Sequence, residues 1–183
     1  MSESLLDDLI RFKELYYTEN KKSIFQKKAQ KYEVATAIAN CFDVNMLLQK
    51  SAYIKPNTNI VFVEYPMFKQ FAQPNNYELF VKYVQNLVSI VIETNKTFEC
   101  HINIDTFTIS AAERYKGVIQ AFNEGVFGYT EYMDAIYIYN SPIMIEKISK
   151  VLLNLLDPTT KKKFKLVKNT DTEDVVVNFN KKT

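Results

Sequence analysis

Residues 132–167 read YMDAIYIYNSPIMIEKISKVLLNLLDPTTKKKFKLV, and this stretch decides the fold. Its first part, Met133–Tyr139, is rich in β-branched and aromatic residues, which predicts a strand. Pro142 favours the first turn of a helix, and the apolar spacing beyond it predicts a helix that ends at Asp157. Phe164–Val167 is again short, apolar and β-branched. The stretch therefore predicts a strand, a helix and a second strand in succession.

The same alternation extends upstream. Ile60–Tyr65 predicts a strand, and the segment from Tyr77 to about residue 93 is apolar on more than one face, which predicts a well-buried helix. Residues 98–104 alternate strictly between apolar and polar side chains, as a strand does. Residues 111–127 predict a helix capped by Ser110, and residues 175–179 predict a last strand. Strands alternating with helices indicate an α/β layer fold.

The first fifty residues predict helices alone. Ser4 and Asp43 are typical helix caps, and residues 23–40 have helical apolar spacing. Residues 55–59, KPNTN, have the composition of a turn and mark the predicted boundary. We therefore expect an N-terminal helical arm over 1–56, a principal domain over 57–168 and a short C-terminal tail over 169–183.

The central stretch resembles the CRAL-TRIO lipid-binding family. The motifs that carry the resemblance are Asn140-Ser141-Pro142 at the end of a strand and Leu156-Asp157-Pro158-Thr159-Thr160 before a lysine-rich, apolar strand. Ile102–Asp105 is similar to the family's central strand and the acidic residue that ends it. The resemblance implies an α/β fold in which a mixed β-sheet is flanked by helices, and in which the sheet floor and the covering helices hold one lipophilic molecule. It also implies a phospholipid or phosphoinositide as the ligand, transferred between membranes or presented at them.

The resemblance also implies site residues. In the phosphatidylinositol-transfer members, an acidic residue, a threonine and a lysine contact the headgroup, and these positions fall on Glu131, Thr160 and Lys163. The alternative is that Glu131 and Lys163 are exposed charges and Thr160 a turn residue. Cys100 and Ile102 occupy positions where choline-lipid binders carry hydroxyls, which argues against a choline-lipid site of that design.

One apolar strand face is the candidate floor of the pocket. A row of such side chains is either ordinary core or the floor of an acyl-chain pocket, which is mostly apolar with a few polar groups at its mouth. The residues expected on the floor are Phe98, Cys100, Ile102, Ile104 and Ile136.

The family's usual C-terminal gate segment has no counterpart in residues 169–183, so the chain is expected to be a minimal version of the domain. The pocket is then open, closed by the N-terminal helices, or covered by a second subunit in a homodimer. The alternative function is a degenerate module that has lost its lipid and binds another protein as a scaffold.

Composition argues against catalysis. The chain has one His, two Cys and three Gly, which is a poor supply of zinc ligands and too few glycines for a nucleotide-binding loop. A nucleophilic site of Cys100, His101 and Asp105 is disfavoured because adjacent strand residues point to opposite faces. We therefore expect no enzyme and no metal. The resemblance implies that the only bound group is a lipid, with phosphatidylinositol or a phosphoinositide as the expected species.

Charge is uneven along the chain although the net charge is only +2. Residues 11–31 hold seven basic residues against Glu14 and Glu19, and residues 161–168 hold five lysines without an acid. Such runs form solvated faces or attract anionic membranes, and Lys161, Lys162 and Lys165 are the candidates for that attraction. With two arginines and this net charge we expect no nucleic-acid partner. The acidic N-terminus and the absence of a ~20-residue apolar run predict a cytoplasmic protein. The lysine runs and the resemblance add the expectation of peripheral membrane association.

Overall fold

The N-terminal quarter of the chain is helical. The structure is a computed structural model, and it describes residues 4–21, 27–142, 145, 156, 158–169 and 174–178. Three helices come first: α1 (Leu5–Glu19), α2 (Lys27–Cys41) and α3 (Val44–Ser51). Ser4 caps α1 by accepting a hydrogen bond from the Asp7 amide, and Asp43 caps α3, so both predicted caps are confirmed.

The remainder is built on a six-stranded sheet in the order β1 to β6. The strands are β1 (Ala52–Ile54), β2 (Ile60–Glu64), β3 (Phe98–Asn103), β4 (Met133–Tyr139), β5 (Phe164–Asn169) and β6 (Asp174–Asn178). Strands β2 to β5 are parallel, whereas β1 and β6 pair antiparallel at the two edges. The α/β mixed sheet with N-terminal helices that the sequence predicts is confirmed.

The turn at residues 55–59 joins two strands of this sheet. Strand β1 pairs with β2, with Ala52 opposite Val63 and Ile54 opposite Val61. The predicted boundary at residue 56 thus falls inside a β-hairpin, and the sheet begins within the segment assigned to the helical arm.

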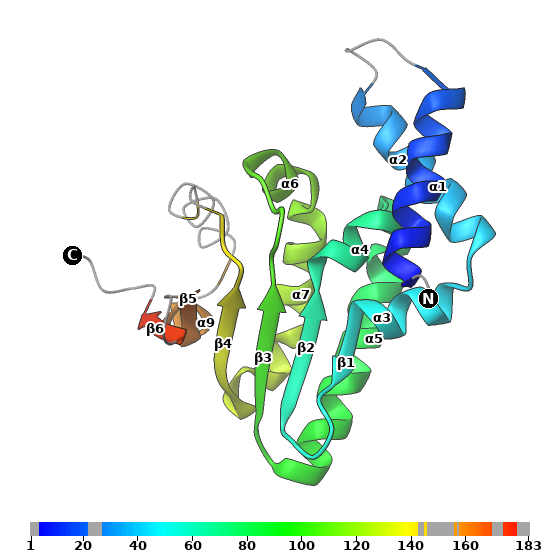
Figure 1. Ribbon diagram of the computed structural model, residues 1–183. Coiled ribbons are helices and arrows are strands. Elements are labelled where there is room, and N and C mark those ends of the chain that lie inside the picture. Colours follow the sequence, from blue (N-terminus) through cyan, green and yellow to red (C-terminus); the bar gives the residue numbers. More distant parts are fainter. Residues whose placement is uncertain are drawn as a thin grey trace.

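Helices connect the parallel strands. Those within the described residues are α4 (Tyr65–Phe71), α5 (Pro74–Asn95), α6 (Ile109–Arg114), α7 (Lys116–Val126), the 3₁₀ helix η2 (Phe127–Tyr132) and α9 (Pro158–Lys163). Helices α5 and α7 cover one face of the sheet, behind the strands in the view of Figure 1. None of the helices in the described ranges combines the length and the hydropathy needed to cross a membrane.

The helix predicted over 111–127 breaks at Tyr115 into α6 and α7, and its cap is Thr108 rather than Ser110: the Thr108 hydroxyl accepts from the Ala111 amide. Threonine and serine are both good caps, so the sequence alone did not separate the two positions. The helix predicted after Pro142 falls largely on residues 143–144, 146–155 and 157, which lie outside the described residues.

One hydrophobic core joins the helical arm to the sheet. It lies between the sheet and α5, with Phe80, Val91 and Phe98 almost fully buried. Leu9 of α1 and Leu47 of α3 are fully buried in the same cluster. The first helices therefore share their core with the sheet.

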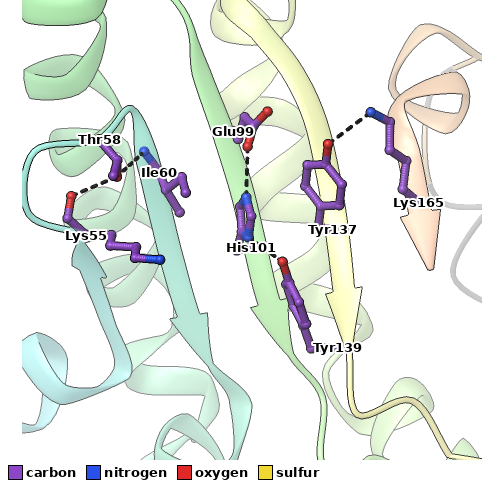
Figure 2. Close-up of polar contacts among 8 residues, drawn as sticks. All are labelled: Lys55, Thr58, Ile60, Glu99, His101, Tyr137, Tyr139 and Lys165. Carbon is purple, nitrogen blue, oxygen red and sulfur yellow. Dashed lines mark hydrogen bonds and ion pairs between the residues drawn. The ribbon is translucent and has the colours of Figure 1, made fainter. Parts of the chain in front are cut away.

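The other face of the sheet carries aromatic and polar side chains (Figure 2). The His101 Nε2 lies 3.0 Å from the Glu99 carboxylate, and its Nδ1 lies 2.8 Å from the Tyr139 hydroxyl. On the neighbouring strands, the Lys165 ammonium donates to the Tyr137 hydroxyl at 3.1 Å. Hydrogen bonding satisfies these polar groups, so the only histidine of the chain is held by its neighbours on this face.

Candidate functional site

An apolar cavity lies between the sheet and its covering helices. The alternation of β3 turns Phe98, Cys100 and Ile102 toward it, and Ile104 continues the row beyond the strand. Strand β4 adds Ile136 and Ile138. All five residues expected on the floor of a pocket therefore line this cavity.

Two helices form its roof. Helix α5 contributes Phe80, Val84 and Val88, because these positions recur every four residues and face the sheet together. Helix α7 contributes further apolar residues: Val118, Ile119 and Phe122. The cavity has a volume of about 250 Å³. An apolar cavity of about 150 Å³ accepts a benzene molecule, so on that scale this one accommodates roughly ten carbon atoms.

The few polar groups on the cavity wall lie toward its two ends. Thr130 precedes β4 and Thr160 precedes β5, so both lie at the N-terminal ends of the parallel strands. Tyr65 follows β2 and lies at the C-terminal ends, together with Tyr115. An apolar middle with polar groups at its ends suits an amphipathic ligand better than a polar one.

The predicted headgroup residues lie at the Thr130 end. Thr160 is buried and lines the cavity, whereas Glu131 is exposed on η2. The Lys163 ammonium donates to the Thr130 carbonyl at 2.8 Å and also to the Met133 carbonyl. These three residues thus come to one end of the sheet, with Lys163 hydrogen-bonded to the backbone of cavity-lining residues.

The three lysines expected to attract a membrane do not form one surface. Lys161 and Lys162 lie on α9, and Lys162 is exposed. Lys165 lies on β5, with its ammonium 4.8 Å from the ring centroid of Tyr137 on the face opposite the cavity (Figure 2). The lysine run is divided because the chain passes from α9 into β5 between Lys163 and Phe164.

The geometry argues against a nucleophilic site at Cys100. Its thiol faces the apolar cavity while the His101 ring is hydrogen-bonded on the opposite face. Burial raises the pKa of the Cys100 thiol to about 12, whereas nucleophilic cysteines have a lowered pKa. Within the described residues, no three His, Cys, Asp or Glu side chains gather into a metal site.

Comparison with known proteins agrees with this arrangement. The family model described as "CRAL/TRIO domain" matches residues 76–182. The fold is similar to that of a solved chain titled "Crystal structure of Sfh5", with a TM-score of 0.57 and 16% sequence identity. That match covers 88% of this chain and 62% of the other, so the chain spans less than two thirds of its structural relative. A search of curated proteins finds no match.

Proposed function

This chain belongs to the CRAL/TRIO domain family, whose members bind lipophilic ligands, and from that premise we propose that it holds one lipid with hydrocarbon in the cavity between β3 and α5. The observation that carries the proposal is the almost wholly apolar lining of that cavity. At about 0.8 kcal/mol per buried methylene, roughly ten carbons contribute about 8 kcal/mol of hydrophobic free energy. Burial of the hydrocarbon alone is therefore enough to keep a lipid bound.

We further propose a phospholipid or phosphoinositide whose headgroup lies near Glu131, Thr160 and Lys163. Thr160 on the cavity wall and the nearby Lys163 ammonium support this end as the polar mouth. Phosphate groups are recognised by ammonium groups and hydroxyls, and both are present here. Transfer or presentation would follow from transient contact with an anionic membrane through Lys161 and Lys162.

The proposal predicts that the protein purifies with lipid. Native mass spectrometry of the intact chain, followed by organic extraction, is expected to show one lipid per protein, because filling an apolar cavity of this size with water costs free energy whereas filling it with hydrocarbon is favourable. Loading the purified chain with phosphatidylinositol vesicles should give the same adduct. A protein that stays empty under both conditions would contradict lipid binding and would favour the protein-binding alternative.

The headgroup assignment predicts that Lys163→Ala weakens phosphoinositide binding about tenfold, as expected for one lost charge-assisted contact. The same change removes the donor from the Thr130 and Met133 carbonyls, so it should also lower the free energy of unfolding by about 1–3 kcal/mol. Urea denaturation gives the fraction folded, and vesicle sedimentation gives binding by the folded protein. Lys50→Ala, at an exposed lysine of α3 that has no proposed role in lipid or membrane contact, is the control. Unchanged phosphoinositide binding by folded Lys163→Ala would show that the headgroup lies elsewhere.

A further inference from the structure

A second cavity, of about 190 Å³, lies at the C-terminal ends of β2 and β3, where the helical arm meets the sheet. Four cationic side chains line it: Lys13 of α1, Lys31 of α2, Lys69 of α4 and Arg114 of α6. Among its described lining residues there is no Asp or Glu. The whole chain has a net charge of only +2, so four cationic side chains around one cavity are a local concentration of positive charge.

The four cations are close enough to affect one another. Burial, together with the smaller effects of the charges on Lys69, Lys31 and Arg114, lowers the pKa of Lys13 to about 8. The Lys13 ammonium donates to the neutral Gln70 amide oxygen at 3.2 Å. Burial lowers the pKa of Lys69 as well, and the charge of Asp105, which does not line the cavity, opposes that shift only in part. The cavity therefore holds like charges that an anion would stabilise.

Hydrogen-bond donors accompany these charges. The Lys69 ammonium contacts the Thr106 hydroxyl at 2.5 Å, and the hydroxyls of Thr108 and Ser110 lie 3.0 Å apart on the cavity wall. The Arg114 Nε is buried and has no hydrogen-bond partner among the described residues. A buried donor without a partner costs free energy, and a bound acceptor would remove that cost.

We infer that this basic cavity binds the phosphate group of an anionic ligand that carries at least two negative charges. A guanidinium matches a phosphate by paired hydrogen bonds, and ammonium groups add point charge. The volume suits one or two phosphate groups, and the exposed side chains of Thr106 and Thr108 leave the cavity open to solvent. The phosphate comes either from a soluble molecule or from a lipid headgroup, and both share this chemistry.

The basic cavity is separate from the proposed lipid headgroup site. Lys163 precedes β5 and so lies at the opposite end of the parallel strands. Tyr65 and Tyr115 line both cavities, with ring centroids 5.9 Å apart, and they form the wall between them. Phosphate binding in the basic cavity therefore does not depend on whether the apolar cavity holds a lipid.

The test uses the full chain and two probes. Calorimetric titration with inorganic pyrophosphate is expected to show saturable binding, and Lys69→Gln and Arg114→Gln should each weaken it about tenfold. Lys50→Gln, an exposed lysine of α3, is the control and should change the dissociation constant less than about twofold. Thermal melting of each variant shows whether it is folded.

The second probe separates the two sources of phosphate. Vesicles of phosphatidylcholine with phosphatidylinositol 4-phosphate are offered to the same variants. Binding of pyrophosphate but not vesicles supports a soluble ligand, and parallel losses with both probes support a headgroup. Absence of binding to both probes, or equal binding by the folded Lys69→Gln, Arg114→Gln and Lys50→Gln variants, would overturn the inference. Mass spectrometry of retained lipid in these samples reports on the apolar cavity separately.

Discussion

Val88→Phe is expected to reduce lipid retention at least tenfold while leaving the protein folded. Val88 is buried on α5 and lines the apolar cavity, so an added ring occupies space that hydrocarbon would fill. If the ring displaces three methylenes, the lost hydrophobic free energy is about 2.4 kcal/mol, which is roughly a fiftyfold change in affinity. The ring enters a void, so the cost of overpacking, about 1–3 kcal/mol in a filled core, is largely avoided.

The matched control lies two residues further along the same helix. Ile90 is 45% exposed, so Ile90→Phe adds a phenyl ring to α5 without entering the cavity. Retained lipid is measured by native mass spectrometry, and affinity by displacement of a fluorescent fatty acid. Cys100→Phe fills the cavity from the sheet side and is a second, independent variant. Equal lipid retention by folded Val88→Phe, Cys100→Phe and Ile90→Phe would show that the ligand does not occupy this cavity.

Local patterns predicted the floor of this cavity because strand alternation is a short-range property. The strict period of two at Phe98, Cys100 and Ile102 specifies one face, and the structure turns that face to the cavity. The apolar character of residues 77–93 predicted a buried helix, and α5 is one. These local patterns did not predict the cavity itself, because a cavity forms only where the side chains of two packed surfaces leave space between them.

The basic cavity could not be found from the sequence. Lys13 and Lys31 belong to a run of lysines that is typical of a solvated or membrane-facing surface. Lys69 and Arg114 lie in later segments without any motif. They meet the first two only in the folded chain, where α4 packs on α1 and α2 and Arg114 lines the same cavity. The short strand β1 was missed for a related reason: three residues are too few for a periodic signal, and pairing with β2 defines the strand.

Leu9→Ala is expected to lower the free energy of unfolding of the whole chain by about 2–5 kcal/mol. Leu9 is the buried residue of α1, is fully inaccessible to solvent and belongs to the core cluster that includes Phe71 of α4 and Phe80 of α5. A domain of this size has a stability of about 5–15 kcal/mol, so the loss is a large fraction of the total. The adjacent Ile10 is 41% exposed, and Ile10→Ala should cost less than about 0.5 kcal/mol.

Urea denaturation followed by two signals tests whether the arm and the sheet unfold together. Far-ultraviolet circular dichroism reports helix content, and amide hydrogen exchange reports protection of β3 and β4 separately from α1. If the arm and the sheet share one core, unfolding is cooperative, and Leu9→Ala lowers the urea concentration at the midpoint by the same amount in circular dichroism and in the exchange of β3 and β4. If the arm is an independent unit, the exchange of α1 accelerates while the protection of β3 and β4 is unchanged. The second outcome would also separate Lys13 from Lys69, and phosphate binding at the basic cavity would then require the arm to be docked.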